Sequence, residues 1–115
     1  MTIETIGTLR ALVHDGATIA TEQDGLDVIG SCYGEDIDIV VLPTERLAED
    51  FFRLRTGLAG AVLQKFQNYG LRVAIVGDIA RFTETSAPLR DFVRESNRGR
   101  HVLFVPDREA LLAAL

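Results

Sequence analysis

The chain of 115 residues has a single cysteine, two histidines and no excess of basic residues. Cys32 has no partner for an internal disulfide, which favours a reducing compartment, and His14 and His101 stand alone without the spacing of a metal site. Twelve lysines and arginines against 17 acidic residues give a formal charge of −5, which disfavours nucleic acid as a partner. We expect no metal and no cofactor.

Long apolar runs and targeting signals are also missing. The first seven residues carry Glu4 but neither a basic cluster nor an apolar stretch, and no run is long enough to cross a bilayer. We therefore expect a cytoplasmic protein without a membrane partner. The length and a composition of 47% hydrophobic and 25% charged residues are typical of one folded domain over residues 1–115.

Three apolar, mostly β-branched segments predict interior strands at residues 37–42, 71–76 and 101–105. Helical spacing of apolar residues separates them, at residues 58–69 and from Ser86 to about residue 97. Alternation of strands with helices requires parallel pairing through right-handed crossovers. The chain should end in a helix that begins at Asp107, a suitable N-cap residue.

The part of the chain before residue 37 predicts a hairpin and a weak helix. Residues 9–13 and 17–20 read as two short extended pieces around a turn, too close together for a crossover helix. Residues 22–32 have helical spacing that Gly25 and Gly30 weaken. We therefore expect an α/β fold with a mixed sheet of about five strands, a hairpin followed by parallel strands, with helices packed on it.

The segment from Arg55 onward is the most informative. Thr56 is placed as the N-cap of a helix, where its hydroxyl would bond a free amide near the positive end of the helix dipole. The same geometry suits a phosphate, bound from solution or attached to Thr56, with Gly57 and Arg55 beside it. The alternative is an ordinary N-cap followed by tight packing of the small residues, in which case Gly60→Val should destabilise the fold.

Several motifs of the chain fit one known family. They are Phe51-Phe52, Arg55-Thr56-Gly57-Leu58-Ala59-Gly60, Gln64-Lys65-Phe66, Asn68-Tyr69, Ala74-Ile75-Val76-Gly77-Asp78 and Glu95-Ser96-Asn97-Arg98-Gly99-Arg100. Over nearly the whole chain they resemble the small bacterial family called domain of unknown function 4180, which has no established activity.

The layout is also similar, more distantly, to the STAS domain, the fold of anti-sigma-factor antagonists, in which a strand leads to a Ser/Thr-Gly-apolar helix start. This resemblance implies a STAS-like sheet and a regulated phosphorylation position at Thr56. Those antagonists usually place an aspartate just before the hydroxyl residue, whereas this chain has Arg55. The chain can therefore share the STAS fold without sharing the regulation by phosphorylation.

Asp78 follows a predicted parallel strand, at the end of the sheet where ligands of α/β folds tend to bind. Ser86, Arg90 and Asn97 would complete a small polar ligand site with it. The alternative is that Asp78 forms a turn and caps the next segment. Arg90 also begins a basic stripe on its helix, although acidic residues three positions earlier should pair with Arg94 and Arg98.

Motifs for nucleotide hydrolysis, dinucleotide binding and serine hydrolysis are missing from the sequence. The leading hypothesis is a small regulatory or protein-binding module without catalytic activity, with an unidentified protein partner or a second copy in a homodimer. Its contact surface would include Phe52, Leu58 and Gly60, since two adjacent aromatics cannot both point into the same core and one of them would be exposed. The alternative is that both aromatics are packed, on different elements. The competing hypothesis is a ligand-binding protein or enzyme with its site around Asp78.

Overall fold

The computed structural model describes residues 1–115 and has a five-stranded sheet in which the strands lie in chain order. The strands are β1 (Thr2–Ile6), β2 (Leu9–Val13), β3 (Ile39–Pro43), β4 (Arg72–Val76) and β5 (Val102–Val105). β1 pairs antiparallel with β2, and every later pair is parallel. The predicted α/β fold with a hairpin and parallel strands is confirmed.

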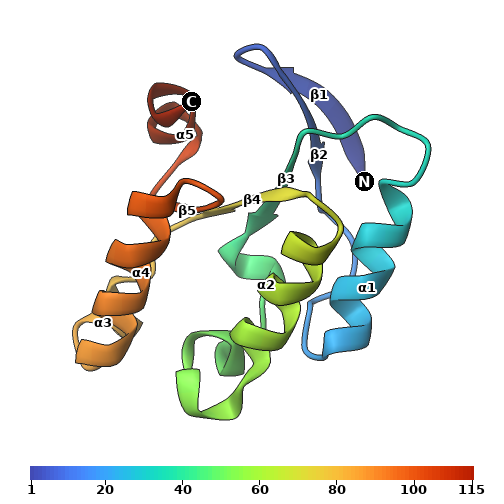
Figure 1. Ribbon diagram of the computed structural model, residues 1–115. Coiled ribbons are helices and arrows are strands. Elements are labelled where there is room, and N and C mark those ends of the chain that lie inside the picture. Colours follow the sequence, from blue (N-terminus) through green and yellow to red (C-terminus); the bar gives the residue numbers. More distant parts are fainter.

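The helices cover both faces of this sheet unequally. They are α1 (Glu22–Ser31), α2 (Leu58–Asn68), α3 (Ala80–Thr83), α4 (Ala87–Gly99) and α5 (Arg108–Ala114), with 3₁₀ turns η1 (Thr44–Arg46), η2 (Glu49–Phe52) and η3 (Leu54–Thr56). Because the strands follow chain order, crossovers of one hand place α1, α2 and α4 on the same face, and α5 packs on the other (Figure 1). None of the helices combines the length and the apolar character needed to cross a membrane.

The central strand β3 shows why the apolar segments become interior strands. Val40 and Leu42 belong to the larger core beneath α1, α2 and α4, whereas Ile39 and Val41 belong to the smaller core beneath α5. All four are at most 1% exposed. A strand that is covered on both faces needs apolar residues at successive positions, as the sequence has here.

The predicted hairpin exists with a different first strand. β1 was not predicted, and it pairs with β2 through a turn in which Gly7 has φ 62°. The segment 17–20 is not a hairpin strand, since its only ladder contact is a parallel bridge between Ile19 and Leu47. Thr2, Glu4 and Thr5 make β1 polar, which is compatible with a strand at the edge of the sheet.

The close approach between helices lies at Gly25 of α1. A Cβ at this position would lie 3.0 Å from Cγ1 of Val62 on α2. At Gly60, where small residues predicted tight packing, a Cβ would meet nothing within 4 Å. The expectation that Gly60 is packed against a neighbouring backbone is therefore wrong, and the glycine that seemed to weaken α1 is the one that packs it against α2.

Candidate functional site

The predicted phosphate position, Thr56, lies in η3 and not at the N-cap of α2. The N-cap is Gly57, whose φ of 77° is in the left-handed region. The Thr56 hydroxyl lies 2.7 Å from the carbonyl oxygen of Asp50 and 2.8 Å from that of Arg53, and it accepts a bond from Leu58 N–H at 3.3 Å. The exposed Thr56 side chain thus ties η2 and η3 to the first turn of α2.

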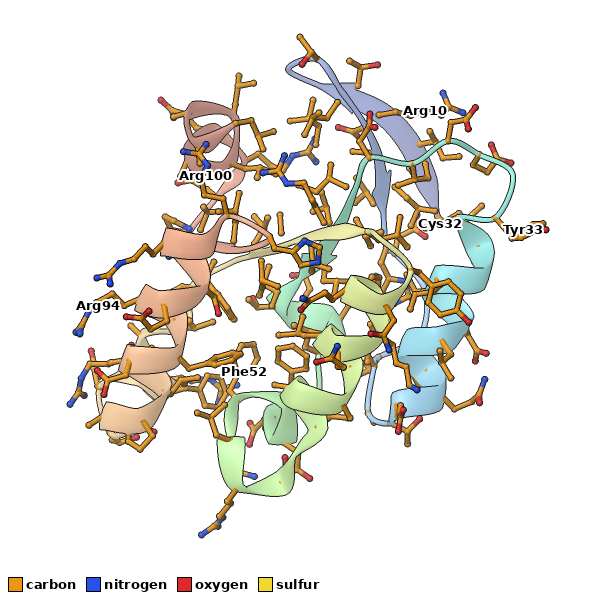
Figure 2. All side chains as sticks on the ribbon, viewed as in Figure 1. Arg10, Cys32, Tyr33, Phe52, Arg94 and Arg100 are labelled. Carbon is orange, nitrogen blue, oxygen red and sulfur yellow. The ribbon has the colours of Figure 1, made fainter.

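The predicted partner surface does not form one exposed apolar patch. Phe52 is 3% exposed and lies in the core, with its ring centre 5.3 Å from that of Phe51 in an edge-to-face arrangement (Figure 2). Leu58 is half-buried against the same core, and only Gly60 is exposed. The expectation that Phe52 serves an exposed contact surface is wrong, because Phe51 and Phe52 are both buried in the same core and their rings pack against each other.

The residues of the predicted polar site cap backbone groups. An oxygen of the Asp78 carboxylate accepts a hydrogen bond from Ala80 N–H at 2.8 Å, at the start of α3. The Ser86 hydroxyl accepts one from Leu89 N–H at 3.2 Å and is the N-cap of α4, as predicted. These are the local bonds that Asp and Ser make at turns and helix starts.

Arg90 and Asn97 also form hydrogen bonds with backbone groups, each in a different part of the fold. Arg90 donates to the carbonyl oxygen of Thr83 at 2.6 Å, where α3 ends. Asn97 bonds the backbone of Phe104 in β5. A cavity of about 290 Å³ beside Asp78 is lined by neither of these two residues nor by Ser86. The four residues are therefore not assembled into one site.

The basic stripe of α4 forms the ion pairs that its spacing predicts. Arg94 pairs with Asp91 and Arg98 pairs with Glu95, each at 3.4 Å. All four side chains are exposed, and Arg94 projects away from the body of the protein (Figure 2). The stripe is a solvated face with intrahelical partners.

The structure brings together residues from three different predicted sets in one place. A hollow of about 630 Å³ lies between the η2–η3 segment and the α3–α4 segment. Its lining includes Phe52, Arg53, Arg55, Arg81, Phe82 and Ser86. We call it the arginine hollow. Sequence reasoning missed it because its two sides come from separate segments of the chain.

Glu49 organises the charges of the arginine hollow. Its carboxylate lies 3.1 Å from the guanidinium of Arg53 and 3.1 Å from that of Arg81. Arg53 also pairs with Asp50 at 3.2 Å. Arg55 takes part in none of the ion pairs or side-chain hydrogen bonds of the structure, so its guanidinium is free to bind another group.

A second hollow, of about 730 Å³, lies where the C-terminal ends of α1 and α2 come together. It is lined by Leu26, Ile29, Gly30, Cys32, Tyr33, Tyr69 and Leu71. We call it the tyrosine hollow. Tyr33 is 93% exposed and Tyr69 is 64% exposed, and Tyr33 points outward beyond the end of α1 (Figure 2). Only Tyr69 belongs to one of the motifs of the family resemblance, and nothing in the sequence links it to Tyr33, because the two tyrosines follow different helices.

Cys32 lies inside the tyrosine hollow as a buried free thiol. Burial raises the pKa of this thiol to about 11. Its Sγ donates to the carbonyl oxygen of Val28 at 3.6 Å. The thiol is therefore protonated near neutral pH and behaves as a small apolar group, not as a nucleophile.

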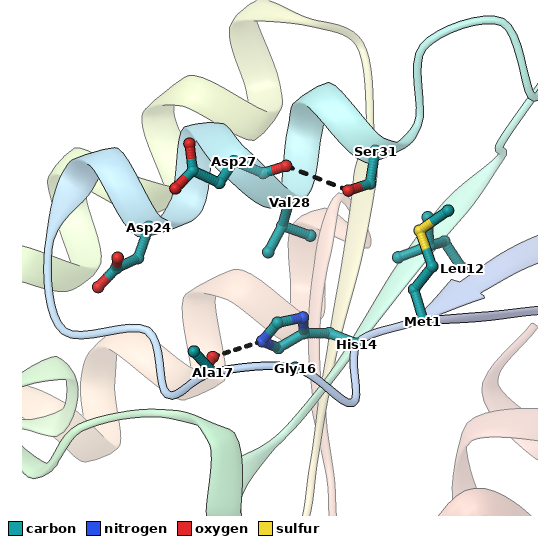
Figure 3. A pocket seen from close by; sticks show the side chains of 9 residues that line it. All are labelled: Met1, Leu12, His14, Gly16, Ala17, Asp24, Asp27, Val28 and Ser31. Atoms are coloured by element: carbon teal, nitrogen blue, oxygen red, sulfur yellow. Dashed lines mark hydrogen bonds between the residues drawn. The ribbon is translucent and has the colours of Figure 1, made fainter.

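A third hollow, of about 300 Å³, lies between α1 and the segment after β2 (Figure 3). Two of its polar groups are paired with the backbone: His14 Nε2 lies 2.8 Å from the carbonyl oxygen of Ala17, and Ser31 donates to that of Asp27 at 3.2 Å (Figure 3). The Asp27 carboxylate accepts from the Gln23 side chain at 2.9 Å. Asp24, also in its wall, forms the capping box of α1 with Thr21. Nowhere in the protein do three or more His, Cys, Asp or Glu side chains gather as a metal site would require.

Comparison with known proteins identifies a family but no individual related protein. The family model described as "Domain of unknown function (DUF4180)" matches residues 8–115. No curated protein and no solved structure gives a significant match. The distant resemblance to STAS domains therefore stays a prediction.

Proposed function

The chain belongs to the DUF4180 family, and on that premise we propose that it is a small cytoplasmic protein-binding module whose contact surface is the tyrosine hollow. The observation that carries this proposal is the exposure of Tyr33 and Tyr69, at 93% and 64%, beside an apolar depression. Exposed apolar surface that gathers in one place is typical of an interaction site, whereas single exposed apolar residues need no explanation.

The chemistry of the tyrosine hollow suits a protein partner. Tyrosine provides a large apolar face with a polar tip and loses little conformational entropy when it is fixed, so it is enriched at protein interfaces. Leu26 and Ile29 add apolar side chains to the lining of the same hollow. A partner that inserts an apolar side chain there would bury both tyrosines. The partner is either another protein or a second copy of the chain.

A binding role without catalysis agrees with the hydrogen bonds that the polar residues make. Asp78, Ser86, Arg90 and Asn97 each bond a backbone group, which leaves them as supports of the fold. Cys32, the one thiol, has a raised pKa that makes it a poor nucleophile. We therefore propose binding without catalysis.

Thr56 is the candidate regulatory position of this module. A phosphate attached to its oxygen would remove the hydroxyl proton that the carbonyl groups of Asp50 and Arg53 share. The unpaired Arg55 next to it would attract the new charge. Mass spectrometry of protein purified from its native cells tests whether Thr56 is phosphorylated. Unmodified Thr56 under every growth condition would contradict this regulation but would leave the proposal for the tyrosine hollow unaffected.

The contact surface is tested by affinity capture from native lysate with matched variants. We expect the wild-type protein to retain a discrete partner that Tyr33→Ser/Tyr69→Ser loses. Leu112→Ser is the control, because Leu112 is 55% exposed on α5, on the opposite face of the sheet. Light scattering of the same proteins over a range of concentrations shows whether the partner is a second copy. Equal capture by wild type and the tyrosine variant would contradict the proposal.

A further inference from the structure

The arginine hollow combines positive charge with room for a ligand. Three guanidinium groups, those of Arg53, Arg55 and Arg81, line it. We propose that it binds the phosphate group of a small phosphorylated molecule. The proposal is independent of the tyrosine hollow, which lies at the other end of α2.

The charge balance of the arginine hollow favours an anion. Glu49 bridges Arg53 and Arg81, and Asp50 pairs with Arg53, so two carboxylates stand against three guanidiniums. The remaining positive charge is on Arg55, which has no partner. This local excess occurs in a chain whose formal net charge is −5. An anion that reaches the hollow would satisfy the one guanidinium that the protein leaves free.

The guanidinium of Arg81, whose side chain is 69% exposed, lies over an aromatic ring that is anchored in the core. Cζ of Arg81 lies 4.3 Å from the ring centre of Phe82, which is stacked on Phe52 with their ring centres 4.7 Å apart. Phe52 is 3% exposed, so this stack is anchored beneath the surface. Glu49 holds the same guanidinium from the side. A positioned arginine loses less side-chain entropy when a ligand binds, which strengthens binding.

The start of α4 contributes a second kind of anion-binding group. Ser86 and Pro88, its N-cap and an early residue, line the arginine hollow, and the helix is 13 residues long. The positive end of the helix dipole therefore lies at the arginine hollow, although Pro88 has no N–H group and Leu89 N–H is already bonded to Ser86. The Ser86 oxygen accepts from Leu89 N–H, which leaves the hydroxyl proton able to donate to a ligand oxygen.

These features fit phosphate better than carboxylate. A phosphate monoester presents three oxygens and up to two negative charges, so it can contact groups that approach from different directions. The arginines come from η2–η3 on one side and α3 on the other, and Ser86 lies at the start of α4. The volume of about 630 Å³ exceeds what a phosphate group alone would fill, which leaves space for an attached organic group.

Nuclear magnetic resonance titration of the whole protein tests the site. The probes are inorganic phosphate and glycerol 3-phosphate, with succinate and chloride at matched ionic strength for comparison. We expect saturable shifts of the Nε–Hε signals of Arg55 and Arg81 and of the amide signals around Ser86 with both phosphate probes. Tighter binding of glycerol 3-phosphate would support a phosphate monoester as the ligand class, whereas equal binding would show that the hollow recognises free phosphate and would overturn the assignment to a phosphorylated molecule.

Variants decide whether the arginine hollow is responsible. Arg55→Gln should weaken phosphate binding by at least about tenfold, the loss expected for one charged hydrogen bond. Arg55 is exposed and unpaired, so this variant should melt like the wild type. Arg94→Gln is the control, because Arg94 is exposed on α4 with a single acidic partner, and it should bind like the wild type. Shifts that do not saturate, that chloride reproduces, or that Arg55→Gln leaves unchanged would overturn the proposal.

Discussion

The side-chain amide of Asn97 in α4 bonds both backbone groups of Phe104 in β5. Its oxygen accepts from Phe104 N–H at 2.7 Å, and its nitrogen donates to the Phe104 carbonyl oxygen at 3.3 Å. The N–H groups of Val73 in β4 and of Gly77 just after it donate to the carbonyl oxygens of His101 and Val105, so the backbone groups of Phe104 face the free edge of the sheet. Asn97 therefore pairs an edge that another strand would otherwise be able to join.

Replacement of Asn97 tests this role. Asn97→Ala removes the partners of two part-buried backbone groups, and we expect it to lower the free energy of unfolding by about 1–3 kcal/mol, as measured by urea denaturation. Asn68→Ala is the control, because its amide oxygen accepts only from Gln64 on the exposed side of α2. A loss no greater than that of Asn68→Ala would show that the edge of β5 does not depend on Asn97.

Two glycine substitutions should change stability in opposite directions. Gly60→Ala adds a methyl group to open space in α2, so we expect a gain of about 0.5 kcal/mol from reduced freedom of the unfolded chain. Gly77→Ala places a methyl group against the side chain of Thr44 at a φ of 146°, so we expect a loss well above about 1 kcal/mol. Thermal unfolding of both proteins measures the difference. Destabilisation by Gly60→Ala would mean that this face is packed after all.

The Thr56 hydroxyl should stabilise the start of α2. Thr56→Val keeps the shape of the side chain but loses its bonds with Asp50, Arg53 and Leu58, so we expect a loss of about 0.5–1.5 kcal/mol in unfolding free energy. Thr56→Ser keeps the hydroxyl and should stay close to the wild type. Equal losses in the two variants would assign the effect to the methyl group instead.

Asp24 should make the stability of α1 depend on pH. The N–H groups of Ala20 and Thr21 donate to its carboxylate at 2.8 and 3.0 Å, and hydrogen bonding, first of all from Ala20, lowers its pKa from the ordinary value of 3.8. The unfolded chain therefore binds the proton more readily, so this contribution to stability is present above pH 3.8 and is lost as the pH falls through the folded-state pKa.

Asp24→Asn supplies the measurement for that prediction. Urea denaturation of this variant and the wild type from about pH 7 down to about pH 2 should show curves that converge at the acid end. A constant difference at every pH would mean that the carboxylate charge adds nothing to the capping box. The carbon resonance of the carboxyl group reports the pKa directly.

The interior strands and two helix starts were predictable because the residues that form them are recognisable in short stretches of the sequence. β3, β4 and β5 are apolar on both faces, and Ser86 and Asp107 stand as N-caps where they were expected. β1 was missed because an edge strand needs no such continuous apolar run. The N-cap of α2 was placed one residue early because Gly57 reaches the capping position through its left-handed backbone and not through a side chain.

The surfaces could not be predicted from local sequence, since they depend on which segments meet. Phe52 was expected at the surface, and its burial depends on stacking with Phe82 from a distant segment. Asp78 and Asn97 were grouped by their position near strand ends, but each bonds a different backbone group. Tyr33 belongs to none of the motifs, Tyr69 belongs only to the Asn68-Tyr69 motif of the family resemblance, and the two line one hollow because α1 and α2 pack against each other at Gly25.

The central claim, that the tyrosine hollow contacts a protein, is tested most directly by site-specific photo-crosslinking in native cells. A photoreactive phenylalanine analogue replaces Tyr33 in one protein and Leu112, on the opposite face of the sheet, in another. We expect one discrete crosslinked product from position 33, either with another protein or with a second copy, and none from position 112. The same products from both positions, or none from position 33, would contradict it.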